Sequence, residues 1–432
     1  MKKIIFLIAI THFQTSYSQN LTEKIATSAD KIESKVIEWR HDFHQNPELS
    51  NRETRTAGII AAHLKKLGIE VQTGVAKTGV VGILKGNKPS PVVALRADMD
   101  ALPVVERVNI PFASKAKSTF NGKEVGVMHA CGHDAHVAIL MGVAEVLANM
   151  KSDLKGTVKF IFQPAEEGTP DGEEGGADLM IKEGVLENPK VDVIFGLHMN
   201  SRLEVGNLSV RTGGMMASAA GLKIVVKGKS THGAMPWAGV DPILVSAQII
   251  NNLQSIVSRN VNLSENAAVV SIGSIHGGNR GNIIPEEVEM IGTVRSLSNE
   301  DEKMIYEKIR QIATKTAEMY GATAAVELPY LIRYPVTLND KEITTMMLPS
   351  LQKSVGIENV LSCSPNTASE DFAFYSQKIP GMFFNLGGMT KGRNPQTAPP
   401  HHSPDFEIDD SGFKSGVKAL TKLVFDYMDK KN

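Results

Sequence analysis

The feature that most constrains the fold is a change in the order of predicted strands and helices near residue 213. Before it, hydrophobic strands alternate with amphipathic helices, which is typical of an α/β sandwich. Over 213–330 the order becomes β-α-β-β-α-β, the order of a ferredoxin-like split βαβ unit, and the earlier alternation then resumes. The chain has 432 residues, more than a typical single domain. We therefore predict an α/β domain at 19–212 and 331–432 with an inserted α+β domain at 213–330.

Hydrophobic periodicity predicts the individual elements. Apolar residues from Ile25 to Phe43 recur at helical spacing, which predicts a helix that ends before Asn46-Pro47. The other predicted helices cover 53–67, 133–150, 177–183, 242–260, 301–320, 342–355 and 411–428, and the predicted strands cover 80–84, 92–95, 158–162, 191–197, 222–226, 268–272, 288–294, 324–328 and 382–386.

Composition excludes several classes of partner. A hydrophobic content of 42% and a charged content of 22% are those of an ordinary globular protein. The 46 basic and 47 acidic residues nearly cancel, and no Lys/Arg-rich run occurs. Nucleic acid and anionic membrane surfaces are therefore poor candidate partners.

The N-terminus has the layout of a secretory signal peptide. Lys2-Lys3 precede an apolar run over 4–10, and a polar segment of small residues ends near Ser18. The run is too short for a permanent membrane span, and a buried N-terminal helix is the alternative. No cysteine lies near the cleavage site, so we expect no lipid anchor. We expect cleavage after 1–18 and an exported protein, periplasmic or extracellular.

Residues able to bind metal gather in one short segment and recur after later strands. Thiolate, imidazole and carboxylate groups bind transition-metal ions, and a site built from them can activate water. The first hypothesis is therefore a metal-dependent hydrolase. The candidate side chains are His129, Cys131, His133, His136, Glu166, Glu167, His198, His401 and His402.

Other interpretations of these residues remain open at this point. A single histidine is more often a core or surface residue than a ligand, and a Glu-Glu pair is usually a solvated acidic patch. In an exported protein Cys131 and Cys363 could form a disulfide. The metal hypothesis rests on several candidates that each follow a hydrophobic strand, where α/β folds collect catalytic groups.

Six motifs in the same order resemble one family. The chain resembles the aminoacylase and carboxypeptidase superfamily of dinuclear metallopeptidases, in its amidohydrolase branch, which includes hippurate and indoleacetyl-amino-acid hydrolases. The resemblance covers nearly the whole chain after the signal peptide. The motifs are Arg96–Pro103, Cys131–Asp134, Gln163–Glu167, Gly196–His198, Ser230–Pro236 and His402–Pro404.

The resemblance implies a zinc-peptidase-like catalytic domain with two divalent metal ions. It also implies that Glu166 is the general acid and base, taking a proton from the attacking water and passing it to the leaving amine. Asp100 would orient a ligand or tune the metals. His401 is ambiguous by spacing, and the His-Ser-Pro match selects its neighbour as the ligand, so His401 could simply face solvent. The implied ligands are Cys131, His133, Glu167, His198 and His402.

One departure from the wider superfamily concerns the metal. That superfamily has a ligand histidine where this chain has Asp98, whereas the amidohydrolase branch, like this chain, carries Cys131. Soft sulfur favours zinc, cobalt or nickel over manganese, although this branch is often assigned manganese. The expected cofactor is two divalent ions, manganese or zinc, with cobalt or nickel as alternatives.

The inserted domain carries three further candidates. In the family, a lid histidine in the position of His232 stabilises the oxyanion in the active site of the partner subunit. Asn282 and Arg295 lie in a stretch that resembles the superfamily's contact with the substrate carboxylate, for which arginine is suited. A homodimer is therefore expected, with contacts from the 222–226 strand edge or the 242–260 helix. A solvated arginine on a strand is the alternative for Arg295, and a histidine in a surface loop is the alternative for His232.

The expected activity is hydrolysis of an N-acyl amino acid to a carboxylic acid and a free amino acid. A dipeptide or other short peptide substrate, as for a dipeptidase or carboxypeptidase, is the closest alternative. A solute-binding module without catalysis is a further one, which the presence of Glu166 beside a full ligand set argues against.

Overall fold

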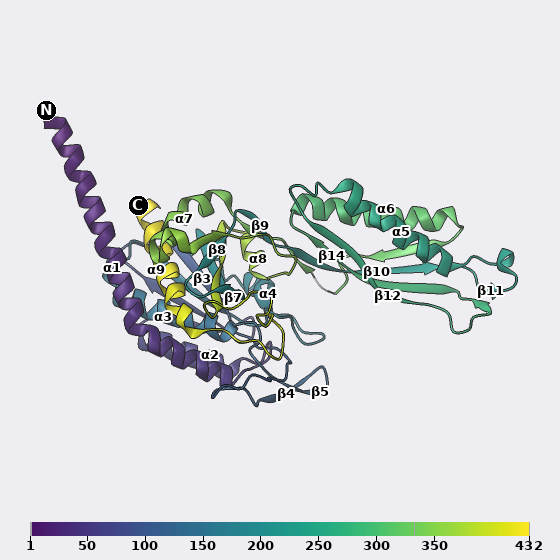
Figure 1. The fold of residues 1–432 in the computed structure, drawn as a ribbon, viewed down its shortest axis with the longest axis horizontal. Coiled ribbons are helices and arrows are strands. Elements are labelled where there is room, and N and C mark those ends of the chain that lie inside the picture. Colours follow the sequence, from purple (N-terminus) through teal and green to yellow (C-terminus); the bar gives the residue numbers. More distant parts are fainter. Residues whose placement is uncertain (1, 332, 432) are drawn as a thin grey trace. The chain divides into compact units, whose positions relative to one another are not determined.

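A computed structural model describes residues 2–331 and 333–431, with side chains from residue 21 onward. The chain separates into two compact units (Figure 1). Unit 1 comprises Met1–Thr212, Asn339–Cys363 and Lys378–Asn432, and unit 2 comprises Gly213–Leu338 and Ser364–Gln377.

Unit 1 is built on an eight-stranded mixed sheet. Its strands run in the order β1-β2-β6-β3-β7-β19-β8-β18. The central pairs β6–β3, β3–β7 and β7–β19 are parallel, whereas β1–β2 and β2–β6 are antiparallel. The strands are β1 (Glu70–Val75), β2 (Gly79–Lys85), β3 (Val92–Asp98), β6 (Thr157–Gln163), β7 (Val193–Glu204), β8 (Leu208–Val210), β18 (Val360–Ser362) and β19 (Gly381–Met389).

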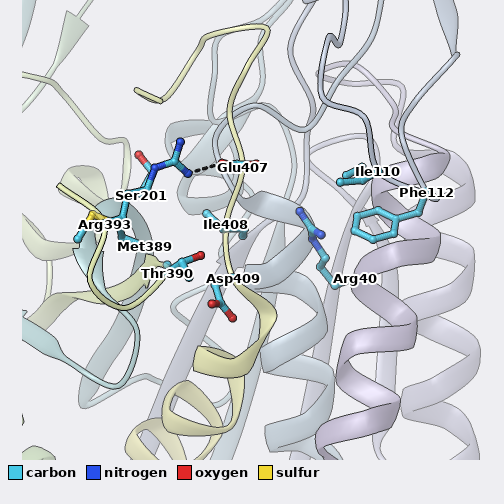
Figure 2. A pocket seen from close by; sticks show the side chains of 11 residues that line it. Arg40, Ile110, Phe112, Ser201, Met389, Thr390, Arg393, Glu407, Ile408 and Asp409 are labelled. Carbon is cyan, nitrogen blue, oxygen red and sulfur yellow. Dashed lines mark hydrogen bonds and ion pairs between the residues drawn. The ribbon is translucent and has the colours of Figure 1, made fainter. Parts of the chain in front are cut away.

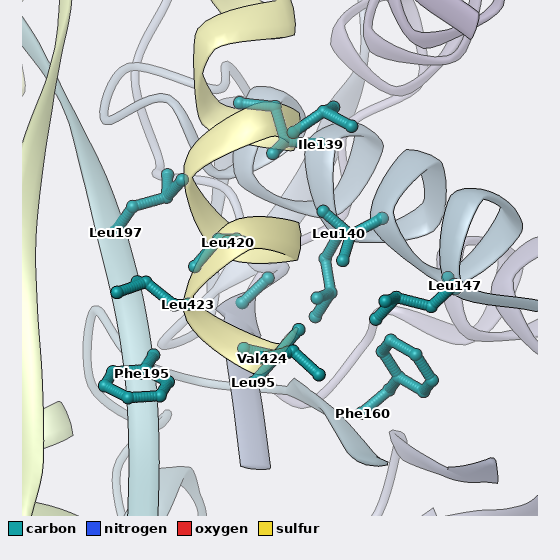
Figure 3. Packing of buried hydrophobic residues seen from close by; sticks show 14 of the residues in the cluster. Leu95, Ile139, Leu140, Leu147, Phe160, Phe195, Leu197, Leu420, Leu423 and Val424 are labelled. Atoms are coloured by element: carbon teal, nitrogen blue, oxygen red, sulfur yellow. The ribbon is translucent and has the colours of Figure 1, made fainter. Parts of the chain in front are cut away.

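Helices pack on this sheet through one continuous hydrophobic core. Strands β3 and β6 are buried at every residue and are mostly apolar, as expected for strands covered on both faces. Figure 3 shows Leu420 and Val424 of α9 beside Leu140 of α3, with Phe195 of β7 and Phe160 of β6 below them. The helices of unit 1 are α1 (Lys2–Gln45), α2 (Thr54–Lys66), α3 (His133–Asn149), α4 (Gly176–Lys182), α7 (Lys341–Val355) and α9 (Phe413–Lys431), and a hairpin is formed by β4 (Lys117–Phe120) and β5 (Lys123–Gly126).

Unit 2 has the predicted β-α-β-β-α-β order. Its strands pair in the order β12-β14-β10-β15, all antiparallel, as in a ferredoxin-like sheet. The two helices share a hydrophobic core with the sheet. The elements are β10 (Ser218–Lys227), α5 (Pro242–Asn260), β12 (Ala268–His276), β14 (Glu287–Ser296), α6 (Asn299–Met319) and β15 (Thr323–Glu327), with the short strands β9 (Gly213–Met216), β11 (Thr231–His232), β13 (Ile283–Ile284), β16 (Arg333–Tyr334) and β17 (Thr337–Asn339) and the helix α8 (Phe372–Ser376).

Two expectations about the insert differ from the structure. The 222–226 strand is not an edge, because β10 pairs with β14 on one side and with β15 and β16 on the other. The edge beside α5 is β12. The sequence-based boundaries gave all of 331–432 to the catalytic domain, whereas Ser364–Gln377 packs with unit 2. Gln377 there donates to the Val336 carbonyl at 2.8 Å, a contact that sequence order does not reveal.

The predicted signal peptide falls on the first part of α1, whose side chains lie outside the described residues. Beyond this segment α1 packs against α3 and α9 through Ile25, Ile32 and Val36. Within the described residues, none of the helices combines the length and the apolar content that a membrane span requires.

Candidate metal centre

Parallel strands of unit 1 bring the predicted site residues to one edge of the sheet. β3 and β6 end shortly before Asp100 and before Glu166-Glu167, respectively. His198 lies inside β7 rather than after it, because β7 extends further than the predicted strand. The β3–β7 pairing ends at Gly196, whereas the pairing of β7 with β19 continues through His198. The site therefore lies at the carboxyl ends of parallel strands, where α/β folds hold ligands.

The Cys131 segment reaches this edge through the turn that begins α3. Gly132 has a φ of 95°, and a Cβ at this position would lie 2.9 Å from the Met199 Cβ. Glycine accepts both the left-handed conformation and the close approach. His133 begins α3 directly afterwards. Cys131 and His133 are 7% and 0% exposed, so the turn places both side chains in the interior.

The Cys131 sulfur lies at the centre of the predicted ligands. Nε2 of His198 is 3.5 Å from Sγ, and Nε2 of His402 is 3.3 Å from it. His402 Nε2 also lies 3.1 Å from Glu167 Oε1. The ligand atoms of Cys131, His133 and His198 lie within 4.8 Å of one another, and so do those of Cys131, Glu167 and His402. The five predicted ligands thus form two groups that share the sulfur.

Asp100 holds three parts of the site together. His133 Nδ1 donates to the Asp100 backbone carbonyl at 2.8 Å and lies 3.3 Å from Oδ1. The backbone N–H groups of Glu166 and Glu167 donate to Oδ1 and Oδ2 at 3.1 and 3.0 Å, and the Ser50 hydroxyl donates to Oδ2 at 2.7 Å. Because its Nδ1 is engaged, His133 presents Nε2 to the other ligands.

A second series of hydrogen bonds fixes His198. The Met199 N–H donates to His136 Nε2 at 2.8 Å, so the His136 proton lies on Nδ1, which donates to Asp98 Oδ1 at 2.6 Å. His198 Nδ1 in turn donates to the Met199 carbonyl at 2.6 Å. Asp98 also accepts from Arg96 at 2.7 Å. Asp98, which takes the place of a ligand histidine of the wider superfamily, therefore acts here through His136 to orient β7.

Burial and the neighbouring carboxylates favour the protonated forms of two predicted ligands. Burial lowers the pKa of His133, but Asp98 and Asp100 outweigh it and raise the pKa to about 10. Burial, together with the charge of Glu167, raises the pKa of the Cys131 thiol well above its usual value. Both groups must lose a proton to bind a metal, so binding would release protons.

The residues fit a divalent transition-metal pair. His133 Nε2 is buried and has no hydrogen-bond partner within the described part of the chain. A cation at this atom would replace the proton that the carboxylates otherwise stabilise, and it would balance their charge. The combination of sulfur, imidazole and carboxylate donors suits zinc, cobalt or nickel, and also manganese through its carboxylates.

Glu53, which sequence analysis did not single out, supports the turn before the glutamates. Its Oε1 accepts the Ala165 N–H at 3.0 Å, and its Oε2 accepts the Thr78 hydroxyl at 2.6 Å. Ala165 has a φ of 53° and directly precedes Glu166. Burial, followed by the charge of Asp100, raises the pKa of Glu53 to about 8. The sequence offered no signal for the role of Glu53, because the Ala165 N–H that its carboxylate accepts lies more than a hundred residues further along the chain.

His401 does not simply face solvent. It is partly buried, its Nδ1 lies 3.6 Å from Cys131 Sγ, and its Nε2 accepts the Ser201 N–H at 3.3 Å. Its ring packs against Phe406, with centroids 4.9 Å apart. The expectation failed because spacing along the chain does not show that the following loop folds Phe406 back onto this ring.

A cavity of ≈ 130 Å³ is lined by Ser201, Arg40 and Arg393, among other residues (Figure 2). Its arginines are already engaged: Arg393 pairs with Glu407, and Arg40 donates to Asp134 at 2.9 Å. Asp134 directly follows His133, so the buried Arg40–Asp134 ion pair supports the start of α3. The metal-binding group remains the better candidate site.

The disulfide alternative is excluded, since Cys131 and Cys363 are both free.

As a ligand, Cys131 should resist iodoacetamide in the metal-loaded protein and become labelled after chelation. The labelling rate after chelation should rise with pH, because the pKa of this thiol is raised and the thiolate is the reactive form. Mass spectrometry of the labelled peptide measures this, with Cys363 as the internal control. Equal labelling of Cys131 in both states would remove it from the ligand set.

The candidates of unit 2 fall into two places. His232 and Asn282 lie together, since β11 and β13 pair His232 with Ile283 and the Gly233 N–H donates to the Asn282 carbonyl at 2.8 Å. Arg295 lies near the C-terminal end of β14, where its Nη1 is 3.4 Å from the Ser369 hydroxyl. His232 is exposed, and its Nδ1 accepts the Ala234 N–H at 3.0 Å. Its proton is therefore on Nε2, where it can be donated to a ligand.

A group of sulfur, imidazole and carboxylate ligands at the carboxyl ends of an α/β sheet, with a further glutamate beside it, defines a metal-dependent hydrolase. The model of Peptidase family M20/M25/M40 matches residues 94–426. The chain belongs to this family, and it is a hydrolytic enzyme that acts on amides. The predicted fold class and the resemblance to the amidohydrolase branch are both confirmed.

Similar proteins differ in the activity that their names state. "Thermostable carboxypeptidase 2" of Saccharolobus solfataricus is 41% identical over 95% of this chain and 100% of its own length. "N-acetylcysteine deacetylase" of Bacillus subtilis is 40% identical over 92% of this chain and 98% of its own. A solved Bacillus subtilis structure, called a dinuclear metal binding peptidase from the M20 family, is 35% identical with a TM-score of 0.76, covering 93% of this chain and 99% of that one.

Proposed function

We propose that this enzyme uses two divalent metal ions to hydrolyse N-acyl amino acids to a carboxylic acid and a free amino acid. The observation that carries the proposal is that, of two adjacent glutamates beside His133, Glu167 also contacts His402. Glu167 lies against His402 in the ligand group of Cys131. Glu166 is nearly buried, and its Oε2 lies 3.9 Å from the Nε2 of His133.

The residues support a general acid and base mechanism. When bound, a pair of divalent ions would acidify a water, polarise the acyl carbonyl and neutralise the charge of the tetrahedral intermediate. Glu166 takes the proton of the attacking water as the new C–O bond forms. It then returns that proton to the nitrogen as the C–N bond breaks, so the amine leaves neutral. Asp100 holds the backbone of Glu166 and the ring of His133 in place during both steps.

Unit 2 would supply substrate contacts. His232 carries its proton on Nε2 and is a suitable donor to the oxyanion. Burial lowers the pKa of Arg295, but its guanidinium stays charged and matches the free carboxylate of an amino acid. His232 lies on β11, which pairs with β13 just before the start of β14, whereas Arg295 lies near the C-terminal end of β14. We infer from this separation that the two residues serve different active sites of a homodimer.

Exposed apolar residues support the dimer. Trp237 is 80% exposed beside the β11–β13 pair, and Ile243 and Leu244 at the start of α5 are 46% and 49% exposed. Ile275 on the edge strand β12 is 48% exposed. Exposed large apolar side chains in this part of unit 2 suggest that a second copy of this chain covers them.

Export is a further proposal, supported by the N-terminal pattern alone. It predicts that the mature protein, isolated from the cells that produce it, lacks residues 1–18. N-terminal sequencing measures this, and an intact Lys2-Lys3 segment on the mature chain would contradict it.

The substrate class is tested by loading the purified enzyme with Mn²⁺, Zn²⁺ or Co²⁺ and measuring released amine. The panel pairs N-acetyl and N-benzoyl amino acids with dipeptides and N-blocked dipeptides of the same C-terminal residue. We expect higher kcat/KM for the acyl amino acids. A preference for peptides would favour the carboxypeptidase activity named for the 41% identical relative.

A further inference from the structure

The environment of the Cys131 sulfur contains three histidine nitrogens, of which only two belong to proposed ligands. His198 Nε2, His402 Nε2 and His401 Nδ1 lie 3.5, 3.3 and 3.6 Å from Sγ. His198 has its proton on Nδ1, which donates to the Met199 carbonyl. Its Nε2 therefore offers a lone pair and cannot donate to sulfur.

In His401, unlike His198, the ring nitrogen that faces the Cys131 sulfur carries the proton. The Ser201 N–H donates to His401 Nε2 at 3.3 Å, which requires a lone pair on that nitrogen. The ring proton must then be on Nδ1, the atom that faces Cys131. His401 is not part of the candidate ligand group formed by Cys131, Glu167 and His402.

We propose that His401 is a positioning residue that donates its Nδ1 proton to the Cys131 sulfur and so tunes the metal–thiolate bond. The proposal rests on Cys131 being a ligand, as in the proposed function. An N–H···S bond withdraws charge from the thiolate and fixes the direction in which it presents its remaining lone pairs. Ser201 sets the tautomer through its backbone, so its side chain is not needed for this role.

Contacts around His401 restrain the orientation of its imidazole ring. Its ring packs against Phe406 and lies 5.3 Å, between centroids, from the ring of His198. The following N–H, that of His402, donates to the Ala130 carbonyl at 2.8 Å, next to Cys131 in the chain. The loop and the thiol segment are thus joined at the backbone as well as through the sulfur.

The test uses Co²⁺ as a spectroscopic probe in the full-length protein. Cobalt bound to a thiolate has a sulfur-to-metal charge-transfer band, whose energy falls when a hydrogen bond to sulfur is removed. His401→Phe keeps a ring that can pack on Phe406 but has no donor. His401→Asn places an amide N–H near the position of Nδ1. We expect the Phe variant to bind the same number of Co²⁺ ions with a band at longer wavelength and roughly tenfold weaker affinity. The Asn variant should restore the wild-type band.

The alternatives give different results. An unchanged band in the Phe variant would overturn the proposal, and so would the loss of an entire ion, since His401 would then be a ligand itself. If the Phe variant does not fold, His401→Leu compared with His401→Asn gives the same contrast. If wild-type protein binds Co²⁺ without any sulfur band, Cys131 is not a ligand, which overturns the proposed metal centre and, with it, the role of His401.

Discussion

Changing Glu166 to Gln should lower kcat by about 10³-fold while metal content stays at the wild-type value. The amide of glutamine has nearly the shape of the carboxylate but cannot accept the proton of the attacking water. The Asp100 contacts to this position come from the backbone N–H groups, so they survive the substitution. Metal analysis by mass spectrometry and turnover of the best acyl amino acid measure the two effects separately.

Two further variants make this result specific. Glu167→Ala should lose metal as well as activity, because Glu167 lies 3.1 Å from His402 within the Cys131 group. Glu124→Gln, on the exposed β4–β5 hairpin, should change neither. Wild-type kcat in Glu166→Gln would show that another group moves the proton.

Mixing two inactive variants should restore activity if His232 acts across a dimer. Glu166→Gln chains keep His232, and His232→Ala chains keep Glu166. After subunit exchange, a mixed dimer would contain one intact site, built from wild-type Glu166 of one chain and wild-type His232 of the other. Random exchange makes half of the dimers mixed, so activity should approach about a quarter of wild type.

Two controls test whether subunits exchange and whether the recovered activity depends on the dimer. Native mass spectrometry of differently tagged chains confirms that exchange has occurred. Trp237→Ser, in the exposed apolar patch, should weaken the dimer and reduce the recovered activity. Confirmed exchange without recovery would mean that His232 does not serve the partner's site, and a monomeric active enzyme would contradict the dimer itself.

Long elements with strong periodicity were predicted almost to their ends. The helix at 242–260 was found as predicted. The helix at 133–150 differs from α3 by one residue at its C-terminal end, and the strand at 158–162 differs from β6 by one residue at each end. Their apolar residues contact the core directly, so burial and local pattern agree.

Weakly periodic elements were not predicted. β1 exposes most of its residues at the sheet edge, β8 and β18 have three residues each, and the β4–β5 hairpin has short polar strands. The segment Ser364–Gln377 joins unit 2 through contacts with residues far away in the chain. None of these elements has a local pattern strong enough to distinguish it from a loop.

The sequence by itself determined which side chains could bind metal and that they follow buried strands, because residue type and hydrophobic period are local properties. Only the tertiary structure decided where each proton lies and which carboxyl groups orient the others. Asp100 reaches His133 and Glu166, and His401 reaches Cys131, across separations of 33 to 270 residues. Such hydrogen bonds depend on the position and angle of two backbones at once, and packing fixes these only when the whole core has formed.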